Sequence, residues 1–150
     1  MPFSISIQKD DFDVGNEYAS LVMNDTHAGA VVFFVGRVRE MNQSRRVSGL
    51  SLEYYSGMTE RVLEQILESA KQRWDLLSVR IIHRVGRLQL MDQIVFVGVT
   101  SKHREQAFQA AEFLMDFLKT QAPFWKKEIT EEGEIWVEAN QKDKVASERW

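Results

Sequence analysis

The spacing of hydrophobic positions along the chain predicts two long amphipathic helices. The first covers residues 57–74, where apolar side chains recur every three or four residues, as the buried face of a helix requires. The second covers about 102–121, and Pro123 should end it near Gln121, because proline disfavours helical geometry in the residue before it. A shorter helix is predicted over 14–25. The apolar face of the second long helix contains Ala107, Phe108, Ala111, Leu114, Met115 and Leu118.

Segments rich in β-branched and aromatic residues predict the strands. Residues 28–40 form an apolar run too continuous for a half-exposed strand, which indicates a central strand. Residues 41–46 interrupt the run and strand character returns at 47–55, so a hairpin with a long basic loop is expected. Residues 140–150 have the composition of a charged, mobile tail. The other predicted strands are 3–7, 78–90, 92–101 and 134–139.

The order of these elements predicts the fold class. Most of the strands are joined by short turns, and the two long helices can cover one face of a sheet. This pattern favours an α+β fold with two layers and a largely antiparallel sheet. No internal repeat or linker-like stretch divides the chain, so residues 1–150 are expected to form a single domain.

Composition narrows the classes of function. The net charge of −3 gives no general attraction to nucleic acid or acidic membranes, so any anion site must be a local basic cluster. The chain has no cysteine, which excludes disulfides and thiolate nucleophiles. Its three histidines lack a repeated metal-ligand spacing, and its glycines form no nucleotide-binding motif, so neither a metal nor a cofactor is predicted. Without a signal peptide or an apolar run of ~20 residues, a cytoplasmic protein is expected.

The start of the second long helix carries one basic cluster. Lys102, His103 and Arg104 follow Ser101, which is the expected N-cap. The helix macrodipole disfavours cations at this end, whereas free amides and basic side chains together would stabilise a bound anion. The cluster is therefore either an anion site or a set of solvated side chains beside Glu105.

A second cluster lies at the end of the apolar run. Arg37 and Arg39 share one face of the predicted strand, because side chains alternate along it. Gly36 would allow a ligand or another backbone to approach closely. Arg45 and Arg46 add charge from the loop. A binding surface and an edge hairpin protected from aggregation by its charge both fit this pattern.

A third cluster lies in the segment FLKTQAPFWKKE, residues 117–128. Lys119 belongs to the last turn of the helix, where a cation suits the macrodipole. Lys126 follows two aromatic residues beyond the proline, and no helix end accounts for it. Burial between aromatic walls would lower the pKa of such a lysine and help it to exchange protons near neutral pH. The alternative is a lysine whose stem covers apolar surface while its ammonium reaches water.

Several long motifs in series resemble one known family. From about Phe12 to Trp150, the chain closely resembles the large subunits of molybdopterin synthase. The resemblance implies a hammerhead-like fold and a sulfurtransferase that converts precursor Z, a cyclic pyranopterin monophosphate, into the dithiolene molybdopterin. The motifs are, in chain order, FVGRVRE, LSLEYYSGMTE, IIHRVGRL, DQIVFVGVTSKHREQAF and MDFLKTQAPFWKKE.

The same resemblance implies the partners of the chain. The sulfur would come from a small ubiquitin-like subunit whose C-terminal Gly-Gly carries a thiocarboxylate and enters a pocket of the large subunit. Large subunits would form a dimer within a heterotetramer. This source of sulfur agrees with the absence of cysteine from the chain.

By position, the resemblance also assigns site residues. It places Lys119 and Lys126 at the reacting centre, with Lys119 the more critical, where the partner's C-terminus meets the pterin. The pocket is implied to draw on both large subunits, so the helix-start cluster can serve the neighbouring protomer. Asn140 stands where the family often has a basic residue, so one phosphate contact is missing or comes from elsewhere. The implied pterin and phosphate pocket comprises Arg37, Val38, Arg39, His103, Arg104, Lys119, Lys126, Lys127 and Glu128, and the candidate substitutes for the missing contact are Arg45, Arg46 and Lys142.

Two other classes of function remain open. A non-catalytic module that binds an anionic pterin or nucleotide would need only the arginines and the helix start. An interaction protein would dock a ubiquitin-like partner through apolar surface and would bind no pterin without it. Substitution of Lys119 by alanine separates these classes, because a binding module would lose a modest amount of affinity and an enzyme would lose turnover.

Overall fold

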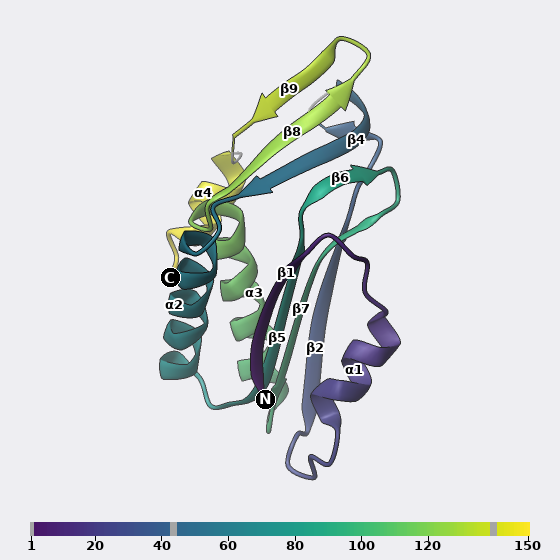
Figure 1. Ribbon diagram of the computed structural model, residues 1–150. Helices are drawn as coiled ribbons and strands as arrows, with labels where there is room; N and C mark the ends of the chain where they lie inside the picture. The colour runs from purple at the N-terminus through teal and green to yellow at the C-terminus, as the bar shows by residue number, and fades with distance from the viewer. Residues whose placement is uncertain (1, 43–44, 139–140) are drawn as a thin grey trace.

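The structure is a computed structural model that describes residues 2–42, 45–138 and 141–150. Its strands divide between a first and a second sheet (Figure 1). Among the described residues, the strand pairings are antiparallel except that of β1 with β5. The first sheet has the order β1 (Phe3–Gln8), β5 (Leu76–Arg84), β7 (Gln93–Ser101) and β2 (Ala30–Arg37). The second has the order β3 (Met41–Asn42), β4 (Arg45–Tyr54), β8 (Phe124–Thr130) and β9 (Gly133–Val137), with β6 (Gly86–Gln89) also paired to β4.

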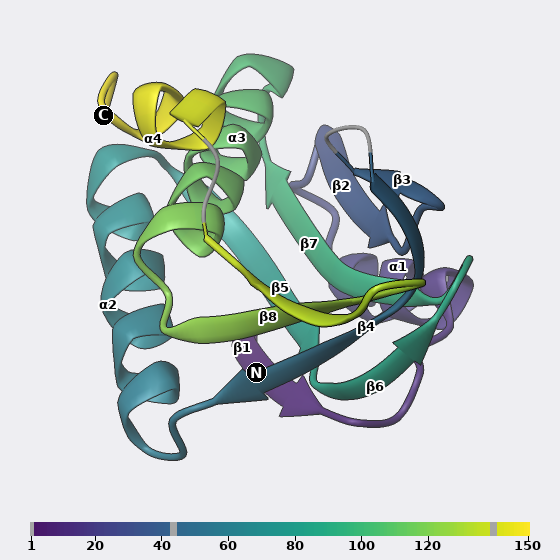
Figure 2. The same cartoon turned by 90° about the horizontal axis from the view of Figure 1, so that it is seen from above.

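Helices cover both faces of the first sheet. α2 (Met58–Arg73) and α3 (Arg104–Thr120) lie on one face, and α1 (Val14–Val22) lies on the other (Figure 1). α4 (Gln141–Ser147) packs against α3 (Figure 2). The predicted α+β class and the two long helices on one face are confirmed. No helix within the described residues is long and apolar enough to cross a membrane.

The main core lies between the first sheet and the two long helices. Leu63 of α2, Leu114 of α3 and Val97 of β7 are completely enclosed there. α3 also turns Ala107 and Ala110 toward the core, and these small side chains allow its backbone to lie close to its neighbours. Truncation of Leu63 or Leu114 to alanine would cost about 2–5 kcal/mol, because each would leave a cavity that the packed surroundings cannot fill.

The limits of α3 follow from local chemistry, and one predicted limit is wrong. The expected N-cap, Ser101, is the last residue of β7, and its hydroxyl donates to the carbonyl of Asp75 at 2.8 Å. His103 occupies the N-cap position instead, without a hydrogen bond from its side chain. The predicted end is confirmed, because Gln121 is the C-cap and its amide donates to the carbonyl of Phe117 at 2.8 Å, two residues before Pro123.

The segment at 28–40 is not a central strand. Among the described strands, β2 pairs with β7 alone and forms one edge of the first sheet. Phe33 and Phe34 remain 44% and 42% exposed on it. A continuous apolar run predicts burial on both faces, but an edge strand with exposed aromatic surface has the same pattern in the sequence.

The predicted hairpin between 28–40 and 47–55 is also wrong, because β2 and β4 belong to different sheets. After β2, the amide of Val38 donates to the carbonyl of Asp92 at 2.9 Å, and the amide of Met91 donates back to Val38 at 2.9 Å. These bonds hold the chain beside the turn between β6 and β7 instead of returning it along β2. β4 pairs with β3, β6 and β8.

Two further elements differ from the predicted ones. The strand predicted over 78–90 divides at Gly86, whose φ of +86° lies in the region that favours glycine, and β6 then joins the second sheet. The charged tail contains α4, and the residues after it are tied to α3. The indole of Trp150 donates to Asp116 at 2.6 Å, and the Arg149 guanidinium donates to the same carboxylate at 2.9 Å.

Candidate active site

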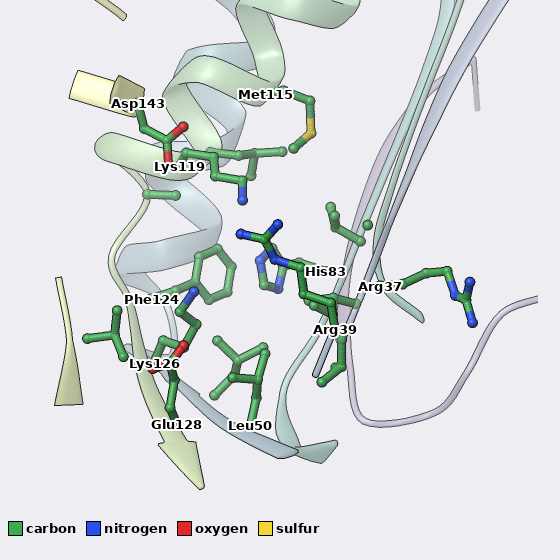
Figure 3. Close-up of a pocket in the computed structure, with 18 of the residues that line it drawn as sticks. Arg37, Arg39, Leu50, His83, Met115, Lys119, Phe124, Lys126, Glu128 and Asp143 are labelled. Atoms are coloured by element: carbon green, nitrogen blue, oxygen red, sulfur yellow. The ribbon is translucent and has the colours of Figure 1, made fainter. Parts of the chain in front are cut away.

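A cavity of about 420 Å³ lies where the C-terminal end of α3 meets the second sheet (Figure 3). Lys119 enters it from the last turn of α3, and Lys126 enters it from β8. Arg39, beyond the end of β2, extends toward the same space (Figure 3). The structure therefore brings together basic side chains from three separate parts of the chain. The apolar part of the wall includes Leu50, Leu52, Ile94, Met115, Leu118 and Phe124.

The orientation of Lys126 follows from the pairing of β8. Lys126 lies opposite Leu52 of β4 and Val137 of β9, so its backbone is fixed on both sides. Since side chains alternate along a strand, Phe124, Lys126 and Glu128 share one face, and all three line the cavity.

Lys127 occupies the opposite face of β8. Its ammonium lies 4.4 Å from the centroid of the Trp136 ring and 3.8 Å from a carboxylate oxygen of Glu134. It is not among the residues that line the cavity. Of the neighbouring pair Lys126 and Lys127, the structure thus places only the first in the candidate site.

The environment of Lys126 lowers its pKa. Burial is the main cause, because the charged form loses hydration, and the nearby charge of Lys119 acts in the same direction. The carboxylates of Glu128 and Asp143 oppose this shift, while the charge of Arg39 adds to it. Lys126 is therefore easier to deprotonate than a lysine in water, which suits a group that gives up a proton during a reaction.

Glu128 is the buried acidic group of the site. Only 1% of its side chain is exposed, and a guanidinium nitrogen of Arg45 lies 3.8 Å from one carboxylate oxygen. Arg45 thus reaches the edge of the site, whereas Arg46 pairs with Glu40 at 3.6 Å, where both side chains are largely exposed. Asp143, from α4, also lines the cavity. Asn140, the departure from the family pattern, lies outside the described residues.

The structure separates the predicted arginines at the end of β2. Arg37 extends away from Lys119 (Figure 3), and its Nε donates to the carbonyl of Met91 at 3.4 Å. Val38 is buried and contributes to the wall, while the Arg39 side chain extends toward Lys119. The close approach expected at Gly36 is intramolecular, because a Cβ there would lie 2.8 Å from a methyl carbon of the Val95 side chain.

The helix-start cluster does not reach this cavity. His103 and Arg104 are exposed at the beginning of α3, and Lys119 lies in its last turn. Fifteen residues of helix place Arg104 and Lys119 about 22 Å apart along the axis, at 1.5 Å per residue. Within one copy of the chain, the residues of the predicted pocket thus lie in two separate places, at the two ends of α3.

His83 is a cavity residue that the sequence interpretation assigned no role. Its ring stacks on Phe124 with centroids 3.8 Å apart and an angle of 14° between the planes. The pKa of its imidazole is lowered to about 4, mainly by burial and also by the charge of Lys119, while the hydrogen bond to the Arg84 carbonyl opposes the shift. The only signal in the sequence was the alternation of β5, which turns His83 to the same face as the buried Val79 and Ile81.

Acidic and histidine side chains do not form a metal centre in the described residues. No group of three or more of them is arranged to hold an ion there. The charged and titratable side chains that line the cavity are ammonium, guanidinium, carboxylate and imidazole groups. Such a site can bind an anion and move protons.

Comparisons with known proteins agree in sequence and in fold. The family model described as MoaE protein matches residues 7–121. A molybdopterin synthase catalytic subunit from Vibrio cholerae is 52% identical over 150 residues, which cover 100% of this chain and 99% of the relative. The solved structure of a molybdopterin biosynthesis MoaE protein from Burkholderia ambifaria has a TM-score of 0.83 and 49% identity, covering 98% and 97% of the two chains. A molybdopterin synthase from Staphylococcus aureus has a TM-score of 0.79 and 35% identity, covering 87% and 94%.

Proposed function

The chain belongs to the MoaE family, and on that premise we propose that its cavity is the active site of a molybdopterin synthase, with Lys119 and Lys126 as the catalytic residues. The protein is a sulfur-transferring enzyme of molybdenum cofactor biosynthesis. The observation that carries the assignment of the site is the convergence of both lysines, from α3 and β8, on one cavity.

The substrate is precursor Z, and the sulfur donor is the C-terminal thiocarboxylate of a small ubiquitin-like subunit. Two sulfur atoms enter the pterin to form the dithiolene, and each donor ends as a carboxylate. Sulfur replaces oxygen without net oxidation or reduction, so the reaction needs no redox partner. The name of the Vibrio cholerae relative, a catalytic subunit, supports the existence of a second subunit.

The two lysines take complementary parts in this transfer. Their ammonium groups attract the negatively charged thiocarboxylate and stabilise the oxyanion that develops as sulfur adds. One of them must also give a proton to the departing oxygen. The lowered pKa of Lys126 suits it to this proton transfer, and the charge of the neighbouring Lys119 contributes to that lowering. Arg39 extends toward the same space and supplies further positive charge for the phosphate of the pterin.

A second copy of the chain completes the pocket. His103 and Arg104 are exposed and distant from Lys119 of their own copy, so they can contact this substrate only at the site of a neighbour. The exposed aromatic edge of β2, with Phe33 and Phe34, offers an apolar surface for assembly. We place this assembly in the cytoplasm, because a chain without cysteine forms no disulfides and does not depend on an oxidising compartment.

The test is single-turnover conversion of precursor Z by the chain mixed with thiocarboxylated small subunit. Wild type and Lys119→Ala are compared, and complex formation is measured on the same samples. Dithiolene product from wild type, with little from an assembled Lys119→Ala complex, supports the proposal. If an assembled wild-type complex binds precursor Z and forms no product, the cavity belongs to a non-catalytic pterin-binding module.

A further inference from the structure

His83 is held in one orientation by two contacts. Its ring lies against Phe124 in a nearly parallel stack, and its Nδ1 lies 2.9 Å from the carbonyl oxygen of Arg84. Only 9% of the residue is exposed, so the ring has little freedom to turn. A side chain fixed in this way can present its remaining nitrogen in a constant direction.

The contact with Arg84 determines which nitrogen carries the hydrogen. A carbonyl oxygen can only accept, so Nδ1 of His83 must be the donor. In a neutral imidazole the other nitrogen, Nε2, then has a free lone pair and acts as an acceptor. Burial and the charge of Lys119 both keep the ring neutral. His83 is therefore an uncharged hydrogen-bond acceptor at neutral pH.

Nothing in the described part of the chain uses this acceptor. The one hydrogen bond of the His83 ring to described residues is the one made by Nδ1, and Nε2 is not among their fully enclosed polar atoms that lack a partner. The side chain lines the cavity beside Lys119 (Figure 3). Nε2 is thus available to a molecule that enters the cavity.

An uncharged acceptor can make a hydrogen bond with a ligand that the charged side chains of this cavity cannot make as favourably. In their charged forms, Lys119, Lys126 and Arg39 can donate to a ligand but cannot accept from it. Glu128 and Asp143 can accept, but their negative charge would repel a phosphate or a thiocarboxylate. A neutral imidazole can accept an N–H or O–H group from an anionic ligand without this repulsion.

We propose that Nε2 of His83 accepts a hydrogen bond from an N–H or O–H group of the pterin substrate and so fixes the orientation of the heterocycle beside Lys119. The proposal rests on the proposed function for the identity of the ligand. His83 acts as a specificity-determining residue that contacts the substrate. It does not relay protons, since its ring stays neutral throughout.

Two substitutions separate the acceptor from the stacked ring. His83→Phe keeps an aromatic ring against Phe124 and removes the acceptor. His83→Gln loses the ring stack, but its amide can donate to the Arg84 carbonyl and its oxygen can accept from the ligand. Thermal unfolding and complex formation with the small subunit identify any variant that fails to fold.

Steady-state kinetics of the complete complex give the first readout. We expect His83→Phe to raise the KM for precursor Z about tenfold with a much smaller change in kcat, because a hydrogen bond to the bound substrate is lost. His83→Gln should raise it less. Equal KM values for wild type and a folded His83→Phe would overturn the proposal. So would a KM increase in His83→Gln that matches or exceeds that in His83→Phe, since the stack and not the acceptor would then matter.

Nitrogen-15 NMR of the complex with labelled histidine gives a readout independent of turnover. The spectrum of His83→Gln identifies the signals of His83 by their absence. We expect hydrogen on Nδ1 and none on Nε2 at pH 7, and a shift of the Nε2 signal when precursor Z is added but not when inorganic phosphate is added. Hydrogen on Nε2, or an Nε2 signal that precursor Z leaves unchanged, would contradict the proposal. Failure of the proposed function would look different, because wild type itself would then form no dithiolene.

Discussion

Lys119 and Lys126 face one cavity from different elements, and the charge of the first lowers the pKa of the second. A turn through Pro123 separates the helix that carries Lys119 from the strand that carries Lys126. Bringing two cations together has an electrostatic cost, and a fold that keeps both in one pocket is suited to a negatively charged ligand. This relationship has consequences that can be measured on the free protein.

The pKa of Lys126 should respond in opposite directions to two neighbouring substitutions. Lys119→Met removes a positive charge that lowers the pKa, so the pKa of Lys126 should rise. Asp143→Asn removes a negative charge that raises it, so the pKa should fall further. Carbon-13 NMR titration of the lysine side chains, with Lys126→Met to assign the signal, measures both shifts. An unchanged pKa in both variants would show that burial alone controls this lysine, and shifts of the same sign would contradict the assigned charge effects.

Substitution of a lysine on either face of β8 should affect turnover to different extents. Lys126→Ala should reduce single-turnover formation of dithiolene by a factor of about 100 or more, because it removes a charge and a proton donor from the cavity. Lys127→Ala is the matched control, since it removes a lysine that lies against Trp136 on the other face. We expect it to change the rate less than about threefold, because the ion pair with Glu134 that it removes lies outside the cavity. Comparable losses in both variants, with complexes intact, would mean that Lys127 turns into the site when the small subunit binds.

Part of this architecture could be predicted because it depends on local sequence. The apolar repeat of residues 57–74 locates α2 to within one residue at each end, and Pro123 locates the end of α3. Such signals depend on side chains a few positions apart, and tertiary contacts did not override them.

The division into two sheets depends on contacts between distant residues, and it could not be predicted in the same way. The segment after Pro123 did not suggest a strand, because two lysines and a glutamate follow its aromatic pair. Once β8 is recognised as a strand, simple alternation separates Lys126 from Lys127. The resemblance to the family grouped these neighbours together, along with Arg37 and Arg39, because a sequence motif contains no information on which way each side chain points.

Mixing two inactive variants should restore activity if the site is shared between copies. Lys119→Ala and Arg104→Ala damage different groups of residues, which lie at opposite ends of α3 within one copy. A mixed dimer would contain one site with both substitutions and one site with neither. Random exchange of equal amounts makes about half of the dimers mixed, so we expect the mixture to form dithiolene at up to about a quarter of the wild-type rate per dimer, whereas each variant alone is impaired. The measurement is single-turnover conversion after the copies have been exchanged by partial unfolding and refolding. If Arg104→Ala is fully active alone, or if exchanged mixtures gain nothing, the second copy does not contribute this residue.

The stability of the protein should depend on the buried imidazole of His83 as the pH falls. The pKa of His83 is about 4 in the folded chain, against an ordinary value of 6.5, so between these values the unfolded chain binds a proton that the folded chain does not. The contribution of this group to the free energy of unfolding should therefore be fully present above pH 6.5 and decrease as the pH falls toward about 4, by up to about 3 kcal/mol.

Urea unfolding of wild type and His83→Gln at pH 7 and pH 4.5 tests this, because glutamine does not titrate and the variant should lose less stability on acidification. His27→Gln, at an exposed position, is the matched control and should retain the wild-type loss. If His83→Gln loses as much stability as wild type over this range, the imidazole is already protonated in the folded chain, and it cannot be the neutral acceptor of the cavity.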